Sequence, residues 1–496
     1  MNRKILFCLL FAVCALVYVL LFSRSTSPLF WISELRFDQA TYQVMGFNWL
    51  EGRIPYRDLF DLKGPMIFAT NAAGYWLTGN RYGITVIQVI LIFFSFVYCY
   101  KLLHIEFNWQ LSLAGTIATF MCLNTAYDEG DNVEELVLPF LFAAYYYGYS
   151  WLKEYEKNGK TRFNWAGPVS FGLVLGVSAM SRLTNAIGVC TLAAITGLLM
   201  ANKKQYKDIG KCAVIFFVTA IVVCLPFITY YLLKGALSDF IYCTWTVASR
   251  YASFFHVRQH IDMYHIAAFS PTILLTIVAA LSAMQKNNKK RVVSIAFLLV
   301  GSVSLIWFAY GIRIVKYAAI GLPFTAVALN LCSCMIKSGK KKTIIASAVT
   351  AITIAIGTWY TALDAYSALL ANKLVTPKHK LLCQNKKTNE ILQIADVIPQ
   401  DKRKGIICLD MGDETYLYVL LKARPPYKYF SVASGISSFD NTFLTEELEE
   451  YRSGNAEYIV TKNNNSEFEK ILKERYTAAY TTTHYILYRL KTKTRQ

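Results

Sequence analysis

The chain has 496 residues, of which 55% are hydrophobic and only 17% are charged, and its formal net charge is +19. The apolar residues gather in runs of about twenty, which is the length that crosses a bilayer as a helix. This pattern excludes an ordinary soluble globular protein and predicts a polytopic α-helical membrane protein. The positive charge recurs in short loops between apolar runs, which argues against a nucleic-acid partner.

About eleven apolar runs are predicted to be transmembrane helices. The first run follows Asn2-Arg3-Lys4 and resembles a signal peptide, but it is too long for one and no small-residue cleavage site follows it. We therefore interpret it as an uncleaved first helix. The predicted spans are 5–23, 82–104, 109–124, 135–152, 166–181, 184–201, 212–233, 264–285, 291–310, 316–336 and 343–361.

The loops that are rich in Lys and Arg alternate with loops of mixed charge. Because short basic loops stay in the cytoplasm, the N-terminus is predicted to be cytoplasmic. The loops 24–81, 125–134, 182–183, 234–263 and 311–315 are then predicted to face outward, with everything after the last helix. The expected location is the inner or plasma membrane.

Two domains are predicted: a multi-helix transmembrane domain over 1–362 and a soluble extracytoplasmic α/β domain over 363–496. In the second, hydrophobic runs shorten, and strands alternate with helical stretches. The predicted strands are 405–410, 427–432, 457–461 and 485–490, and the predicted helices are 388–397, 414–422, 446–451 and 467–474. Asp410 and Asp413 flank a strand-to-helix turn, where they fit a helix cap better than a metal site.

The first outer loop, 24–81, is predicted to contain two amphipathic helices that lie along the membrane surface. Asp38 can cap a helix over about 39–51, which Gly52 ends, and Pro65 can begin a second helix over about 65–79. The first of these helices places three large apolar side chains on one face: Tyr42, Met45 and Trp49.

Charged residues concentrate between these two predicted helices. The segment reads Gly52-Arg-Ile-Pro-Tyr56-Arg57-Asp58-Leu-Phe-Asp61-Leu-Lys63-Gly64-Pro65. Ionisable residues at a membrane face cost free energy unless they are paired or used, so the cluster is a candidate functional site. Lys63 precedes a helix N-terminus, which favours an anion such as a lipid-linked phosphate. Alternatively, Lys63 pairs with Asp61 or reaches toward lipid headgroups.

Asp38 lies beside an apolar helix and near this cationic segment. Its carboxylate can accept a proton from an attacking hydroxyl or amine. The alternative role is the helix cap described above, and the two roles do not exclude each other.

The second outer loop carries five acids in the sequence Tyr127-Asp-Glu-Gly-Asp-Asn-Val-Glu-Glu135. Asp131 and Glu134 have the spacing of a capping box for the next helix. Asp128 and Glu129 have no such structural role. A dense acidic loop over 128–135 can bind a divalent cation or position a polar acceptor, but no His or Cys pattern accompanies it, so no metal site is predicted.

Several outward-facing cations can line an anionic cleft, because charge-assisted hydrogen bonds to phosphate are strong. Each by itself also fits a side chain that anchors a helix end at the lipid headgroups. The residues are Arg182, Arg250, Arg258, Arg313 and Lys316.

In this order, the features resemble a GT-C glycosyltransferase: an outer-loop Asp opening a helix, the motif G-x-x-P-Y-x-D-x-x-D-x-K-G-P, and a second acidic outer loop. The chain is similar to the bacterial relatives of the dolichyl-phosphate-mannose protein mannosyltransferases and of the lipid A aminoarabinose transferase. The strong match covers about 36–84.

The resemblance implies a hexosyl- or pentosyltransferase that moves a sugar from a polyprenyl-phosphate donor, with inversion, to an acceptor glycan, lipid or protein on the outer face of the membrane. Asp38 matches the catalytic aspartate that activates the acceptor, and Lys63 matches a lysine that contacts the donor phosphate. Where the aminoarabinose transferase has Glu-Lys-Pro, this chain has Asp-Leu-Lys-Gly-Pro. Asp61 is a better match than Asp58 for the glutamate of that motif.

Further roles follow from the same resemblance. Asp128, Glu129 or Asp131 takes the second-loop acidic role, and the sequence does not choose among them. Donor phosphate binding is shared by Lys63, Arg182, Arg313 and Lys316. The site is shaped by Tyr56, Arg57, Asp58, Asp61 and Pro65. The phosphate leaving group is stabilised by cations, so no metal or other cofactor is expected.

Two other functions fit parts of the sequence. A transporter or flippase for a lipid-linked saccharide explains the helices and the outer cations, but it is expected to show repeat symmetry and charges near the bilayer midplane. A sensor with the C-terminal domain as its ligand-binding module leaves the charged segment 38–65 unexplained.

Overall fold

The computed structural model describes residues 3–159, 163–255, 261–285, 291–310, 314–335, 340–370, 386–409, 411–430, 441–463 and 469–491. The chain divides into two compact units, and neither is one continuous stretch. Unit 1 comprises Met1–Ser23, Ile87–Ile228 and Phe255–Ser367, and unit 2 comprises Arg24–Val86, Thr229–Phe254 and Ala368–Gln496. The predicted domains 1–362 and 363–496 stay a prediction.

Each of the predicted spans coincides with a helical segment of the described chain. They are α1 (Arg3–Phe22), α4 (Tyr82–Leu103), α5 (Trp109–Met121), α6 (Val133–Asn158), α7 (Ala166–Ala179), η3 (Leu183–Ala186) with α8 (Ile187–Asn202), α9 (Tyr206–Leu233), α12 (Met263–Ala283), α13 (Arg291–Tyr310), η5 (Val315–Gly321) with α14 (Leu322–Met335), and α15 (Lys340–Leu370). Within the described residues, 7 helical segments are long and apolar enough to cross a membrane. The chain is thus a multi-pass membrane protein, and the predicted total of about eleven spans stays a prediction.

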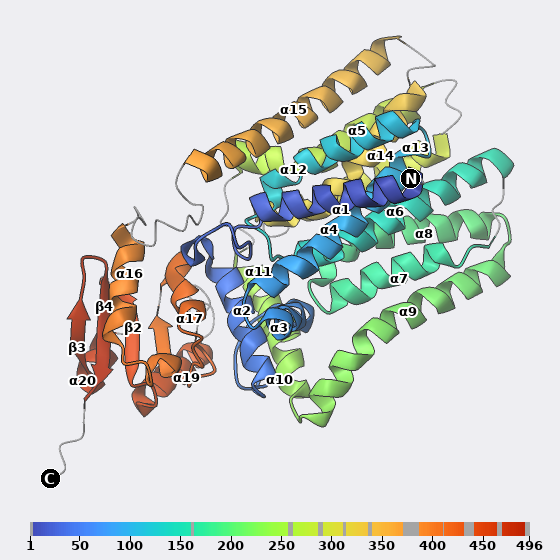
Figure 1. Ribbon diagram of the computed structural model, residues 1–496. Helices are drawn as coiled ribbons and strands as arrows, with labels where there is room; N and C mark the ends of the chain where they lie inside the picture. The colour runs from blue at the N-terminus through green and yellow to red at the C-terminus, as the bar shows by residue number, and fades with distance from the viewer. Residues whose placement is uncertain are drawn as a thin grey trace. The chain divides into compact units, whose positions relative to one another are not determined.

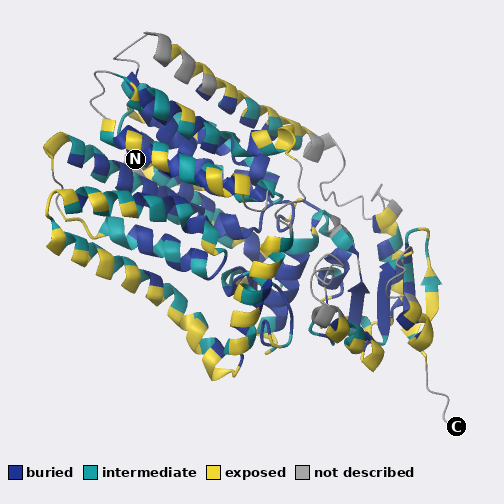
Figure 2. Cartoon of the chain, turned by 180° about the vertical axis from the view of Figure 1, so that it is seen from behind, coloured by how far each residue is buried: buried dark blue, intermediate teal, exposed yellow. Residues whose placement is uncertain are grey.

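The core of unit 1 lies where α6, α12, α13 and α14 pack on one another. Helix α6 is buried along most of its length, whereas α9 is mainly exposed, as the colours of Figure 2 show. Exposed Leu, Ile, Val and Phe side chains on α9 are what a lipid-facing helix requires, because hydrocarbon solvates them at no cost. Figure 1 shows these helices as a bundle.

Unit 2 contains α2 (Phe37–Leu50) and α3 (Pro65–Thr78), which lie side by side (Figure 1). Gly46 permits their close approach, since a Cβ there would lie 2.7 Å from the Cβ of Asn71 and 2.8 Å from the backbone nitrogen of Ala72. The segment 39–48 is buried on every side, so α2 has no polar face of the kind that a surface-lying amphipathic helix requires.

The C-terminal part of unit 2 is a four-stranded sheet with the order β1-β2-β4-β3. The strands are β1 (Ile406–Leu409), β2 (Tyr458–Lys462), β3 (Tyr476–Thr481) and β4 (Tyr485–Leu490). β1 and β2 are parallel and buried, with Ile406 opposite Tyr458, while β4 is antiparallel to both of its neighbours. β3 is an edge strand whose residues are mostly exposed.

Helices accompany this sheet. They are α16 (Lys386–Val397), η7 (Gly412–Thr415), α17 (Tyr416–Leu420), α19 (Asn441–Ser453) and α20 (Glu469–Arg475). α16 contacts β4, α17 contacts β1, and α20 contacts β3. Other helical turns among the described residues of unit 2 are η1 (Ile32–Glu34), α10 (Leu237–Ile241), the π-helical segment η4 (Tyr242–Val247), η6 (Arg403–Gly405) and all but the last residue of α11 (Ala248–Phe255).

The predicted α/β character of the tail is confirmed, with two corrections. Residues 427–430 form no strand, because the segment is held by side chains and by another loop rather than by a sheet neighbour. β3 was missed because its exposed Thr and Ala residues lack the alternation of a half-buried strand. Asp410 lies outside the described residues.

Candidate active site

The loop between α2 and α3 is folded by its own polar groups. The Oδ2 atom of Asp58 accepts a hydrogen bond of 2.7 Å from the backbone N–H of Ile54, and the backbone N–H of Tyr56 donates to the carbonyl of Leu59 over 2.7 Å. Gly52 and Tyr56 have φ angles of 94° and 72°. A left-handed conformation is uncommon for a tyrosine and marks a position that the surrounding structure enforces.

Tyr56 is held in this conformation by its surroundings. Its side chain is fully buried, and its ring packs against Phe68, Tyr231 and Phe240 with centroid distances of 6.0, 5.4 and 5.4 Å. Its hydroxyl donates a 2.6 Å hydrogen bond to the carbonyl of Lys63. Tyr56 therefore fixes the backbone at Lys63.

Lys63 lies between two carboxylates. Its Nζ atom is 2.9 Å from Oδ1 of Asp38 and 3.7 Å from Oδ1 of Asp61. The backbone N–H of Lys63 also donates to Oδ1 of Asp61 over 2.9 Å. The ring of Tyr42 lies 5.4 Å from the ammonium group, within reach of a cation–π interaction. The structure thus brings together Asp38, Asp61 and Lys63, three of the predicted site residues.

This arrangement has clear electrostatic consequences. Burial acts to lower the pKa of the Lys63 ammonium, but the carboxylates of Asp38 and Asp61 outweigh it and raise that pKa well above its usual value. Burial raises the pKa of the Asp61 carboxyl, and Lys63 opposes the change only in part. The Lys63 ammonium is therefore held in its charged form, while the Asp61 carboxyl takes up a proton more readily than an exposed aspartate does.

The helix-cap role predicted for Asp38 is wrong. Helix α2 begins at Phe37, its N-cap is Arg36, and no side chain caps it. Asp38 lies in the first turn, where its charge is favourable toward the helix dipole, and its side chain turns to Lys63. The side chains of Asp38 and Lys63 are each 21% exposed, so both remain accessible to a ligand.

Pro65 is the first residue of α3, with Gly64 as the N-cap, as predicted. Arg57 pairs with the neighbouring Asp58 through an Nε–Oδ1 distance of 2.9 Å. Because the Arg57 side chain is 45% exposed, this pair contributes little to stability. Asp58 thus supports the loop, and Asp61 is the acid that faces Lys63, as the sequence favoured.

A segment of the C-terminal part, 423–430, is bound to this loop within unit 2. The side-chain amide of Asn48 donates to the carbonyl of Ala423 over 3.1 Å, and the backbone N–H of Phe60 donates to the carbonyl of Lys428 over 2.9 Å. The guanidinium of Arg53 donates to the carbonyl of Pro425 and, over 2.8 Å, to that of Asp58. The C-terminal segment therefore stabilises the loop that carries Asp61 and Lys63.

The acidic loop over 127–135 belongs to unit 1 and has a strained backbone. Asp128, Glu129, Gly130 and Asp131 have φ angles of 47°, 67°, 78° and 54°. Left-handed non-glycine residues cost roughly 1–2 kcal/mol each, so packing must hold this turn. At Gly130 there is no room for a side chain, since a Cβ would lie 2.1 Å from the hydroxyl oxygen of Ser23.

Two predicted cations pair with this loop and the helix after it. Nζ of Lys316 lies 3.6 Å from Oδ2 of Asp128. Arg182 forms an ion pair with Glu134, whose side chain is 1% exposed, and its guanidinium lies 3.4 Å from the ring centroid of Tyr317. Asp128, one of the three acidic candidates, thus pairs with the predicted cation Lys316.

The capping box predicted for Asp131 and Glu134 is wrong, because Glu134 is turned to Arg182. The backbone N–H of Asp131 instead donates to Oε2 of Glu135 over 3.0 Å. Glu135 also accepts hydrogen bonds from Tyr127 (2.6 Å) and Gln88 (2.8 Å). Sequence analysis missed Glu135 as the residue that holds the loop; its signal was a second consecutive acid in the first turn of α6.

The remaining predictions on these residues have simple outcomes. Arg313 and Arg258 lie outside the described residues. Among the described residues, no group of three or more His, Cys, Asp or Glu side chains is placed to hold a metal ion.

The sequence and the whole structure were compared with those of known proteins. Neither a family model nor a curated protein matches the sequence. Solved structures do match. ArnT from Cupriavidus metallidurans, bound to undecaprenyl phosphate, is similar with a TM-score of 0.57 and 10% identity, over 97% of each chain. Its apo state matches with a TM-score of 0.55 and 10% identity, over 98% of each chain.

The apo oligosaccharyltransferase of Archaeoglobus fulgidus is also similar, with a TM-score of 0.51 and 11% identity, over 97% of this chain and 74% of that chain. Both proteins are GT-C enzymes. The chain has the GT-C fold. At this identity the likeness establishes the fold alone, and it confirms the fold that the motif at 52–65 led us to expect.

Proposed function

We propose that this protein is an integral membrane glycosyltransferase that takes a sugar from a polyprenyl-phosphate donor and transfers it, with inversion, to an acceptor glycan, lipid or protein. The observation that carries the proposal is the placement of Lys63 between Asp38 and Asp61, at 2.9 and 3.7 Å. A cation and a partly exposed carboxylate in direct contact are the two groups that such a transfer requires. The undecaprenyl phosphate bound by ArnT, which shares this fold, supports the donor class.

The donor phosphate is proposed to bind Lys63. The sugar phosphodiester is an anion, and the Lys63 ammonium retains its proton because two carboxylates raise its pKa. As the bond between the anomeric carbon and the phosphate oxygen breaks, negative charge develops on the leaving phosphate. A preorganised cation stabilises that charge strongly in a site that excludes water. No metal is required for this step.

Asp38 is proposed to be the general base. Without a donor, its carboxylate is neutralised by Lys63. When the donor phosphate attracts Lys63, that carboxylate is released and can accept the proton of the acceptor hydroxyl or amine as it attacks the anomeric carbon. Donor binding and base activation are therefore coupled, which protects the donor from reaction before it is correctly bound. Asp61 remains beside Lys63 and holds its ammonium in place.

The orientation and location are proposals as well. The basic loops 153–162 and 203–211 are assigned to the cytoplasm, which places the loops with Asp38 and Asp128 outside, in the inner or plasma membrane. Asp128 and Lys316 are proposed to support the outer face of unit 1 through their ion pair, with Arg182 anchored by Glu134. The acceptor class is left open between glycan, lipid and protein.

The test is sugar release from a panel of radiolabelled polyprenyl-phosphate monosaccharides by the purified full-length protein in lipid vesicles. We expect the wild type to release sugar from one class of donor and Asp38→Asn to release none, while the variant still binds that donor. Equal release by Asp38→Asn would overturn the proposed base.

The same panel addresses the alternative, a flippase for a lipid-linked saccharide. Vesicles are assayed with a reagent that reacts only with sugar in the outer leaflet. Intact labelled lipid that changes leaflet in the presence of the protein, without any release of sugar, would exclude the transferase and favour transport.

A further inference from the structure

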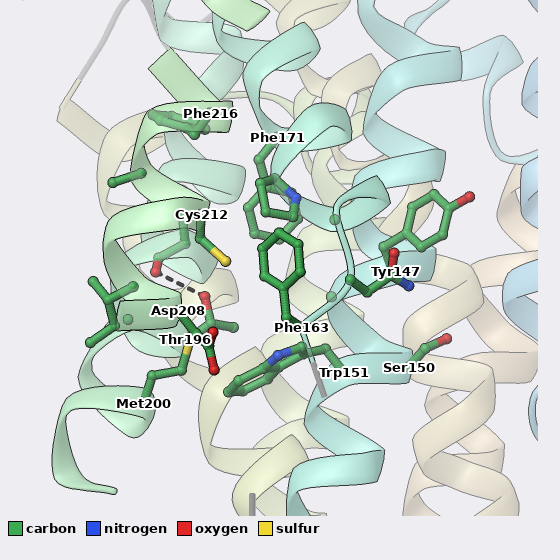
Figure 3. A pocket seen from close by; sticks show the side chains of 18 of the residues that line it. Tyr147, Ser150, Trp151, Phe163, Phe171, Thr196, Met200, Asp208, Cys212 and Phe216 are labelled. Atoms are coloured by element: carbon green, nitrogen blue, oxygen red, sulfur yellow. Dashed lines mark hydrogen bonds between the residues drawn. The ribbon is translucent and has the colours of Figure 1, made fainter. Parts of the chain in front are cut away.

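Unit 1 contains a pocket of about 290 Å³ between the ends of α6, α7, α8 and α9, which is separate from the outer loops. Its walls are mainly aromatic and aliphatic. Figure 3 shows Phe171, Phe163 and Trp151 one after another along the pocket, with Cys212 and Asp208 of α9 facing them. Apolar walls of this kind do not hold water well, so the pocket suits a hydrocarbon chain.

Small residues create the pocket. A Cβ on Gly172 would lie 2.5 Å from the carbonyl oxygen of Phe216, so α9 is held tightly against α7 at that level. In contrast, a Cβ on Gly197 of α8 would meet no atom within 4 Å, and one on Gly167 would meet only the Cβ of Tyr147 at 4.0 Å. The helices therefore separate around Gly197 and Gly167, both of which line the pocket.

The pocket lies at the membrane face opposite the acidic outer loop. Twenty positions of α6 separate Glu134, beside that loop, from Glu154, which lines the pocket. At about 1.5 Å per residue the distance along the helix is about 30 Å, which equals the thickness of the hydrocarbon core. A lipid in this pocket therefore belongs to the leaflet at the basic-loop end of the bundle.

The charges at the pocket define the headgroup that fits. Two carboxylates, those of Glu154 and Asp208, line it. Nζ of Lys211 lies 3.6 Å from Oδ1 of Asp208 and 5.5 Å from the ring centroid of Phe163, so one ammonium group is placed at the same end. Carboxylates bind a primary ammonium through charge-assisted hydrogen bonds, and Lys211 can bind a phosphate.

We propose that this pocket binds one acyl chain of a glycerophospholipid whose headgroup carries both a phosphate and a primary ammonium, as in phosphatidylethanolamine. The phosphate contacts Lys211, and the ammonium contacts Glu154 and Asp208. A choline headgroup fits less well because its quaternary ammonium has no N–H to donate. A glycerol headgroup brings no ammonium group to the two carboxylates. The site is independent of the proposed transferase reaction.

The test is native mass spectrometry of the purified full-length protein with phosphatidylethanolamine, phosphatidylcholine or phosphatidylglycerol of identical acyl chains. We expect the ethanolamine lipid to bind the wild type roughly threefold more tightly than the other two, the size of one ion pair near the surface. Glu154→Gln is expected to remove that preference, and Glu154→Asp to restore most of it. A preference of the wild type for the choline or the glycerol lipid would overturn the proposed headgroup chemistry.

Variants that fill the pocket with a side chain distinguish lipid bound at this site from lipid bound elsewhere on the protein. Gly197→Leu places a side chain in the pocket and is expected to abolish the preferential binding. Gly210→Leu is the matched control, because Gly210 is exposed on α9, does not line the pocket, and has open space at its Cβ. If Gly197→Leu lowers the melting temperature more than Gly210→Leu does, Gly167→Leu takes its place.

Retained preference for the ethanolamine lipid in a folded pocket-filled variant would overturn the site. Displacement of that lipid by an equal concentration of undecaprenyl phosphate would also overturn the proposal, since the occupant would then be a carrier chain. We expect no such displacement.

Discussion

The charged cluster around Lys63 and the one around the acidic loop 127–135 pair their charges differently. In unit 2, one cation, Lys63, faces two carboxylates, and all three residues lie within the segment 38–63. In unit 1, each cation has a carboxylate partner that is distant in sequence: Arg182 pairs with Glu134, and Lys316 with Asp128. A cation with two carboxylates can leave one of them for a ligand and remain bound to the other. The first cluster is therefore suited to chemistry, whereas the ion pairs of the second connect segments that are distant in the sequence.

The largest effect on the turnover rate is expected from substitution of the proposed general base, Asp38. Asp38→Asn retains the size of the side chain and removes its ability to accept a proton, so the turnover rate is expected to fall about 10³-fold. Donor binding should be retained and should tighten a little, because Lys63 loses the competing carboxylate that lies 2.9 Å away. The measurements are the rate of single-turnover sugar transfer and, in parallel, the equilibrium binding of the donor. Asp58→Asn is the control, because Asp58 supports the loop and does not touch Lys63; an equal loss in both variants would mean that the loop geometry, not proton transfer, had been disturbed.

Breaking an ion pair in the second cluster is expected to lower the free energy of unfolding. Arg182→Gln leaves the buried Glu134 without its cation, at a cost of about 3 kcal/mol, the lower end for a buried pair because Arg182 is partly exposed. The double variant Glu134→Gln/Arg182→Gln should recover much of this loss, since no buried charge then remains unpaired. Thermal unfolding in detergent measures both. If Arg182→Gln unfolds like the wild type but loses donor affinity, Arg182 binds donor phosphate and the contrast between the clusters fails.

Lys63→Met removes the donor-binding cation and leaves a side chain of similar length. Donor binding should weaken about tenfold to a hundredfold, the value of a charge-assisted hydrogen bond. Lys63→Arg should retain part of the affinity because the charge is kept. Equilibrium binding of labelled donor is the measurement. Unchanged affinity in Lys63→Met would contradict the proposed phosphate site.

Protonation of Asp61 is expected to make the affinity for the donor depend on pH. Its carboxyl pKa is raised by burial, so as the pH falls from 7 through that pKa, Asp61 takes up a proton in the folded protein before it would in an unfolded chain. Lys63 then loses a competing anion, and donor binding should tighten by roughly threefold. Asp61→Asn should already bind at pH 7 with the tighter affinity and show a flat profile. If the wild type binds the donor more weakly as the pH falls, the predicted direction of the pH dependence is wrong.

The smallest effect is expected at Arg57. Its pair with Asp58 is exposed, so Arg57→Gln should alter the free energy of unfolding by less than about 0.5 kcal/mol and leave transfer intact. The measurements are thermal unfolding and transfer rate. A large loss of transfer with unchanged stability would assign Arg57 to the site after all.

The contrast between the clusters also explains which site residues sequence analysis could find. Asp38 and Lys63 were predicted because a charged segment with turn residues lies between two helix signals, and such a segment brings its own ends together. The role of Asp38 as a helix cap was wrong, because the helix already begins at Phe37 and the Asp38 carboxylate contacts Lys63. Glu135 and Arg53 were missed, since their partners are set by folding and not by spacing.

The sequence by itself determined the membrane helices, the two helices of the first outer loop and the α/β tail, because hydrophobic periodicity, proline and glycine act locally. Only the tertiary structure decided which carboxylate faces which cation. It paired Arg182 with Glu134, bound the segment 423–430 to the loop of Asp58, and opened a pocket at Gly197. Charges interact through space, and cavities form where packing is incomplete, so both depend on neighbours that sequence spacing does not specify.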